Sequence, residues 1–129
     1  MIAIDTSALM AIVLDEAQST ACKDVIGTED EVLISAATVA EALIVASRRN
    51  VEDEMISLIE GLGLIVVPLS AAAARRVALA YARWGKGAHP ARLNFGDCFA
   101  YAVAKEHDCP LLYVGKDFER TDLLAAVSP

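Results

Sequence analysis

Four acidic residues stand where an alternating pattern of strands and helices would bring their side chains together. They are Asp5, Glu41, Asp97 and Asp117. Two of them come directly or shortly after short apolar runs that read as strands, and the other two fall in the predicted first turns of apolar helices. Strand ends and the following helix starts share one edge of a parallel α/β sheet, and ligands bind at that edge. We therefore expect these four carboxylates to converge on one site.

A cluster of carboxylates requires a cation, because like charges repel. At about 4 Å, two of them repel by roughly 4 kcal/mol at the effective dielectric of a protein surface. Ligand sets made only of oxygen favour Mg²⁺ or Mn²⁺. The only histidines, His89 and His107, are too few and too far apart in the sequence for a zinc site. The acidic residues therefore predict a magnesium or manganese centre.

Each acid also has a purely structural explanation. Asp5 could be the N-cap of a helix, and Glu41 could complete a capping box with Thr38, since these residues match the S/T-x-x-E pattern. Asp97 stands in a first helical turn, where the helix dipole favours an acid. Asp117 could be a turn residue. The two explanations are compatible, because a residue at a helix start can both cap the helix and coordinate a metal.

The elements that would position the acids alternate along the chain. Short apolar strands are expected at residues 1–4, 31–35, 64–67 and 111–114, with a candidate edge strand at 123–127. Helices are expected at residues 8–14, from 15 or 19 to 27, and at 38–50, 51–60, 71–84 and 95–107. This alternation predicts an α/β fold with a central, mostly parallel sheet of four or five strands and helices on both faces.

Polar residues mark two of the expected helix starts. Thr6 or Ser7 suits the cap of the first helix, and Ser70 suits the cap of the long Ala-rich helix that ends near Trp84. The following segment, residues 85–94, is the longest loop-like stretch of the chain.

The composition indicates one domain over residues 1–129, because no Pro-rich, Gly/Ser-rich or charge-block stretch reads as a linker. The apolar fraction is 56% and the mean hydropathy is +0.46. The longest uncharged run, residues 61–74, falls short of the about 18 residues that a membrane span needs, so no membrane association is expected. We attribute the apolar excess to buried parallel strands and to a surface covered in a homodimer.

The remaining bulk features bear on location and partners. The N-terminus carries no basic region or apolar segment of signal length, so we expect a cytoplasmic protein. Three cysteines without a C-x-x-C pair read as free, mostly buried thiols. A net charge of −7 disfavours nucleic-acid binding. However, several acids belong to the proposed cation site, and basic residues concentrate in the segment 75–92.

The ordered set of motifs resembles a known family, the PIN-domain ribonucleases, and more narrowly the toxins of VapBC toxin–antitoxin pairs. The resemblance covers essentially the whole chain. It rests on Asp5-Thr6-Ser7-Ala8, Glu41 opening a mid-chain helix, Gly96-Asp97-Cys98-Phe99-Ala100-Tyr101-Ala102, and Asp117-Phe118 with Thr121-Asp122.

This resemblance implies a PIN-like three-layer α/β/α sandwich and a Mg²⁺- or Mn²⁺-dependent endoribonuclease that dimerises and is inhibited by a cognate VapB-type antitoxin. It implies metal ligation by Asp5 and Asp97, directly or through water, with Glu41 and Asp117 completing the acidic site. Ser7 or Thr6 would orient the Asp5 side chain without binding the metal ion directly.

One departure from the family pattern leaves the fourth acid open. Many relatives carry Thr-Asn-Asn or Thr-Asn-Asp after the last strand, whereas this chain has Val114-Gly115-Lys116-Asp117. The fourth acid is therefore either Asp117 or Asp122. The same departure brings a cation, Lys116, close to the expected site.

The expected chemistry is in-line attack of metal-activated water on an RNA phosphodiester, with one or two metal ions. Residues 85–94, with Lys86, His89 and Arg92, are a candidate RNA contact, although a flexible connection explains them as well. Phosphotransfer is disfavoured, because Asp5-Thr6-Ser7 is not D-x-D and no acid follows the third strand, and nucleotide binding is disfavoured because no phosphate-binding glycine loop is present. The other alternative is a catalytically silent PIN-like binding module whose acids dock a basic partner.

Overall fold

A parallel sheet of four strands forms the middle layer of the computed structural model, which describes residues 1–127. The strands lie in the order β3-β2-β1-β4, and all three pairings are parallel. Their bounds are β1 (Ile2–Ile4), β2 (Val32–Ser35), β3 (Ile65–Val67) and β4 (Leu111–Leu112). The four strands expected from the sequence are confirmed, each slightly shorter than expected. The expectation of one domain reaches residues 128 and 129, which lie outside the described residues, and stays a prediction.

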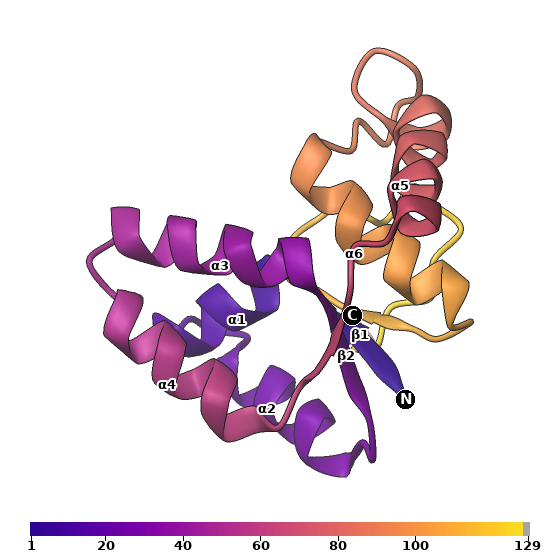
Figure 1. The fold of residues 1–129 in the computed structure, drawn as a ribbon. Helices are drawn as coiled ribbons and strands as arrows, with labels where there is room; N and C mark the ends of the chain where they lie inside the picture. The colour runs from indigo at the N-terminus through magenta and orange to yellow at the C-terminus, as the bar shows by residue number, and fades with distance from the viewer. Residues whose placement is uncertain (128–129) are drawn as a thin grey trace.

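Between residues 1 and 127, six helices cover the two faces of the sheet. They are α1 (Thr6–Val13), α2 (Ser19–Thr28), α3 (Ala36–Arg48), α4 (Glu52–Leu62), α5 (Ala71–Trp84) and α6 (Phe95–Glu106). Figure 1 shows α1 to α4 gathered on one side of the strands and α5 and α6 on the other. The predicted three-layer α/β/α sandwich is therefore confirmed. Within residues 1–127, no helix is long and apolar enough to span a membrane.

Side chains of the central strands alternate between two hydrophobic cores. Ala3 and Leu33 belong to the core under α5 and α6, whereas Ile4 and Ile34 belong to the core under α1 to α4. Strand β1 is buried on both faces, which explains why its sequence is continuously apolar rather than alternating.

The C-terminal segment returns to the outer edge of β4. The backbone N–H of Leu111 donates to the carbonyl of Leu124 at 2.9 Å, and that of Ala126 donates to the carbonyl of Leu111 at 2.9 Å. This contact forms an isolated parallel bridge between Leu111 and Ala125 rather than a strand. The candidate edge strand at 123–127 is thus reduced to a single bridge, and the sheet has four strands.

Two helix starts differ from the sequence-based expectation. Asp5, and not Thr6 or Ser7, is the N-cap of α1, which confirms the structural explanation considered for Asp5. Helix α3 begins directly after β2, where the Ser35 hydroxyl accepts a hydrogen bond from the Ala37 N–H at 3.2 Å. The predicted capping box between Thr38 and Glu41 is therefore wrong, because Ser35 caps the helix earlier and Glu41 lies beyond its first turn. The Ser70 cap of α5 is confirmed.

Candidate active site

The four predicted acids occupy four different elements near the carboxyl ends of the central strands. Asp5 directly follows β1, Glu41 lies in α3, Asp97 lies in the first turn of α6, and Asp117 lies in the loop after β4. Asp5 is 5% exposed and Asp97 is 7% exposed. Glu41 is partly buried, whereas Asp117 is exposed.

Ser7 holds the carboxylate of Asp5. Oδ2 of Asp5 accepts hydrogen bonds from the Ser7 hydroxyl at 2.7 Å and from the Ser7 N–H at 3.1 Å. The Ser7 hydroxyl in turn accepts from the backbone N–H of Val114 at 3.0 Å. Ser7 therefore links the end of β1 to the chain leaving β4, and it fixes the Asp5 side chain between them.

Thr6 and Gly96 determine where Glu41 lies. The Thr6 hydroxyl donates to Oε1 of Glu41 at 2.6 Å. On the other side, a Cβ atom added to Gly96 would overlap Oε2 of Glu41 and would lie 2.8 Å from its Cδ. The Glu41 carboxylate thus packs against the first turn of α6, beside Asp97, in space that only a glycine leaves open.

Asp97 is held by a capping box at the start of α6. The Asp97 N–H donates to the Asn94 side-chain oxygen at 2.8 Å, and Oδ2 of Asp97 accepts from the Asn94 N–H at 3.0 Å. The sequence reading recognised the favourable helix position of Asp97 but missed Asn94. The N-x-x-D spacing of these two residues was the signal that could have revealed it.

The pKa values of two buried acids indicate that the carboxylates act on one another. Burial raises the pKa of Asp97 to about 7, although the backbone N–H of Asn94 acts in the opposite direction. The negative charges of Asp5, Asp117 and Glu41 add to the rise. Burial likewise raises the pKa of Asp5 to about 6, against the hydrogen bonds that its carboxylate accepts, and the charge of Glu41 adds to that rise. Asp97 therefore lies in the electrostatic field of all three other acids.

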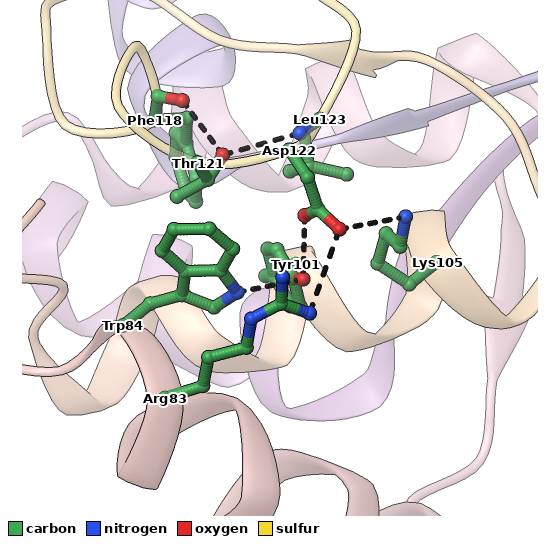
Figure 2. Close-up of polar contacts among 8 residues, drawn as sticks. All are labelled: Arg83, Trp84, Tyr101, Lys105, Phe118, Thr121, Asp122 and Leu123. Carbon is green, nitrogen blue, oxygen red and sulfur yellow. Dashed lines mark hydrogen bonds and ion pairs between the residues drawn. The ribbon is translucent and has the colours of Figure 1, made fainter.

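Asp122 has different surroundings. Its Oδ1 accepts from the Tyr101 hydroxyl at 2.7 Å, and its Oδ2 lies 3.1 Å from Nζ of Lys105 and 3.8 Å from Nη1 of Arg83 (Figure 2). Both of its oxygens are thus engaged by Tyr101, Lys105 and Arg83. Of the two candidates for the fourth acid, the geometry favours Asp117.

The available oxygen atoms fit a hard divalent cation. Asp5, Glu41 and Asp97 each use one carboxylate oxygen in the hydrogen bonds described above. The other oxygens of Glu41 and Asp97 accept no hydrogen bond from any residue between 1 and 127, and the other oxygen of Asp5 accepts none from Ser7. The neighbouring thiol of Cys98 is fully buried, and a soft sulfur ligand does not suit Mg²⁺ or Mn²⁺. A set of carboxylate oxygens matches Mg²⁺ or Mn²⁺.

The acids do not, however, stand in a finished coordination geometry. In the described part of the chain, no three His, Cys, Asp or Glu side chains are grouped closely enough to hold a metal ion as they stand.

Comparison with known proteins identifies the family. The PIN domain family model matches residues 2–124, a span that contains all four acids. The chain is 40% identical over 130 residues to Ribonuclease VapC28 of Mycobacterium tuberculosis, covering 96% of each chain, and 38% identical over 125 residues to Ribonuclease VapC of Mycolicibacterium smegmatis, covering 95% of this chain and 97% of that one.

Solved structures agree on the fold. VapC20 of Mycobacterium tuberculosis, described as a sarcin-ricin loop cleaving toxin, aligns over all of both chains with a TM-score of 0.79 at 18% identity. A toxin–antitoxin complex from Klebsiella pneumoniae aligns with a TM-score of 0.71 at 17% identity, covering 95% of this chain and 93% of that one. The matched family model and the extensive identity together establish that this chain belongs to the PIN domain family.

Proposed function

We propose that this chain is a divalent-metal-dependent endoribonuclease that acts as the toxin of a toxin–antitoxin pair. The observation that carries the proposal is that acids from three other segments, Asp5, Glu41 and Asp117, act electrostatically on one buried carboxylate, Asp97. The fold alone would not specify an activity. Relatives about 40% identical over nearly the whole chain are named ribonucleases, and they support RNA as the substrate.

In this proposal, Asp5 and Asp97 hold Mg²⁺ or Mn²⁺, and Glu41 and Asp117 complete the site. When bound, such an ion supplies a water of lowered pKa and neutralises charge on the phosphate oxygens. The chain's own contribution is orientation. Three first-turn or loop groups, the Ser7 hydroxyl, the Thr6 hydroxyl and the Asn94 N–H, each fix one oxygen of a carboxylate and leave the other free.

The proposed partners are an antitoxin of the VapB type and a second copy of the chain. Structural neighbours include VapBC complexes from Rickettsia felis and Salmonella typhimurium, which support an antitoxin as partner. An Arg or Lys side chain of an antitoxin could pair with the same acids and so exclude the metal ion. Homodimerisation is supported by large exposed apolar side chains on α5 and α6, such as Leu79 and Phe95, both 69% exposed.

A second candidate function is a catalytically silent binding module. The spacing of the acids favours it, because no three of them in residues 1–127 form a ready coordination site. A planar guanidinium from a partner can bridge carboxylates that stand further apart than metal ligands do. In this case the acidic site would bind the partner and cleave nothing.

Metal-dependent RNA cleavage by the purified chain, freed of any partner, tests the proposal. We expect cleavage with Mg²⁺ or Mn²⁺, none with EDTA, and none by Asp97→Asn. Asp24→Asn is the matched control, because Asp24 is an exposed acid of α2, away from the site. If the wild type binds a basic antitoxin peptide but cleaves no RNA with either metal, the binding module is the correct function.

A further inference from the structure

Asp117 differs from the other three acids in how its side chain is held. Asp5, Glu41 and Asp97 each accept a hydrogen bond from a nearby protein donor. Among residues 1–127, none donates a hydrogen bond to the carboxylate of Asp117, which lies in an exposed loop. The position of this side chain must therefore come from whatever fixes the loop.

The loop is fixed just after Asp117 by burial and by local hydrogen bonds. Phe118 is 1% exposed, and its ring centroid lies 5.0 Å from that of Tyr113. The Thr121 hydroxyl donates to the carbonyl of Phe118 at 2.7 Å and accepts from the Leu123 N–H at 3.3 Å. Residues 118–123 therefore form a braced turn (Figure 2), and Asp117 directly precedes it in the chain.

The far end of this turn is anchored to α5 and α6 through Asp122. The indole N–H of Trp84 donates to the Tyr101 oxygen at 2.8 Å, and the Tyr101 hydroxyl donates to Asp122 at 2.7 Å. Trp84 and Tyr101 are both buried. Lys105 adds an ion pair to the other oxygen of Asp122 at 3.1 Å (Figure 2). This chain of bonds joins a buried aromatic pair to the loop.

Helix α6 carries both Asp97 of the acidic site and Tyr101 of the hydrogen-bonded Trp84–Tyr101–Asp122 chain. Tyr101 lies four residues after Asp97, about one helical turn further along the same helix. The helix that presents Asp97 to the acidic site therefore also holds Asp122, and through it the loop that carries Asp117. A single rigid element thus sets the spacing between the two acids.

We propose that the Trp84–Tyr101–Asp122 chain is a positioning device that holds Asp117 at the acidic site, with Asp122 acting through Asp117 rather than as a ligand itself. This inference rests on the proposed function. It assigns a role to the Thr121-Asp122 part of the last motif, which the acidic site does not use. Burial raises the pKa of the Tyr101 hydroxyl to about 12, so it stays protonated and remains a donor.

Mn²⁺ binding to the full-length, metal-free chain, followed by electron paramagnetic resonance, tests the inference. We expect Asp122→Ala and Tyr101→Phe each to weaken Mn²⁺ affinity about tenfold, as partners that orient metal ligands do. The matched control is Glu106→Gln, which removes the surface ion pair between α5 and α6 that Glu106 makes with Arg76 at 2.7 Å. It should leave Mn²⁺ affinity unchanged.

A double-mutant cycle separates positioning from a direct or merely structural role. In an Asp117→Asn background, Asp122→Ala should cause no further loss of Mn²⁺ affinity. Hydrogen exchange of the amides of residues 115–122 should accelerate in Asp122→Ala, while exchange in α1 stays unchanged. Tyr101→Phe keeps the buried ring and provides the same test if Asp122→Ala does not fold.

The outcomes distinguish this inference from the proposed function. Wild-type protein that binds no Mn²⁺ overturns both. Wild-type protein that binds Mn²⁺ while Asp122→Ala and Tyr101→Phe bind it equally well overturns only the positioning role. Fully additive losses in the double mutant overturn it as well, because Asp122 would then act independently of Asp117.

Discussion

Two carboxylate sites of this molecule, the acidic site of four acids and the single carboxylate of Asp122, have opposite electrostatic surroundings. At the acidic site, no Lys or Arg of residues 1–127 forms an ion pair with any of the four acids. Burial and the neighbouring acids raise the pKa of Asp97 to about 7. Around Asp122, burial acts to raise the pKa, but the hydrogen bonds from Tyr101 and Lys105 outweigh it and lower the pKa.

The difference distinguishes an acid that stabilises the fold from acids that are available to bind a ligand. Asp122 is neutralised by its own chain, as expected of a group that stabilises the fold. The acids around Asp97 repel one another, and the fold tolerates that cost without supplying a cation. Strongly raised pKa values among clustered acids are typical of functional sites. The changes below test this contrast, beginning with the largest expected effect.

Removing one negative charge from each of the two sites should have opposite consequences for stability. Asp5→Asn should reduce RNA cleavage by at least about a hundredfold, because it removes a proposed ligand. The fold should persist, since Asn also caps helices well, and loss of repulsion should keep or raise the free energy of unfolding. Cleavage rates and urea unfolding measure both effects. Asp122→Asn, by contrast, should lower the free energy of unfolding. An undiminished cleavage rate in Asp5→Asn would refute its assignment as a ligand.

Adding one methyl group at Gly96 should displace Glu41. Because the new Cβ would overlap Oε2 of Glu41, we expect Gly96→Ala to reduce cleavage about tenfold or more. Gly61→Ala is the matched control, since Gly61 also lies in a helix but has no atom within 4 Å of an added Cβ. It should be neutral for cleavage and slightly stabilising, by up to about 1 kcal/mol. Equal cleavage by both variants would show that Glu41 has room to move without loss.

The pH dependence of stability should report the raised pKa values. The pKa of Asp97 in the folded protein, about 7, lies above its ordinary value of 3.8, so folding favours the protonated form. This contribution is present below about pH 4 and is lost as pH rises through about 7. At about 1.4 kcal/mol per pKa unit, metal-free protein should lose roughly 1 to 4 kcal/mol of unfolding free energy between pH 5 and pH 8.

Urea unfolding in EDTA at several pH values measures this loss. Asp97→Asn should flatten the profile, and a saturating concentration of Mn²⁺ should restore stability at the higher pH, because the ion replaces the proton. A profile that is equally steep in Asp97→Asn would place the origin of the pH dependence elsewhere.

The smallest effect is expected in the loop formed by residues 85–94. The Lys86 N–H donates a hydrogen bond to the Leu93 carbonyl at 2.9 Å, which closes the base of the loop. Within the loop, Nδ1 of His89 accepts a hydrogen bond from the Ala91 N–H at 3.0 Å. If Lys86 and Arg92 contact RNA phosphates, replacing both by Ala should weaken binding of a catalytically inactive variant a few-fold. The dependence of log affinity on log salt should fall by about 1 per contact. Unchanged affinity and salt dependence would remove the loop from the RNA surface.

Sequence reasoning predicted well the features that depend on neighbouring residues. The apolar runs predicted all four strands, and the Ser70 cap and the long Ala-rich helix were found because caps and helix propensity are local properties. Thr38 and Glu41 show where local patterns fail. Their S/T-x-x-E spacing matches a capping box, but the short connection from β2 starts the helix earlier, at Ser35.

By itself, the sequence determined which elements form, their alternation, and which four acids are candidates for the site. Only the tertiary structure decided what holds each acid. The Thr6 bond to Glu41 joins residues 35 positions apart, and the Val114 bond to Ser7 joins residues 107 positions apart. Likewise, the contrast between Asp117 and Asp122, five residues apart, depends on α5 and α6 packing beside the loop. The physical reason is that hydrogen bonds and burial act through space, and distances in space depend on the strand order β3-β2-β1-β4, which no local pattern encodes.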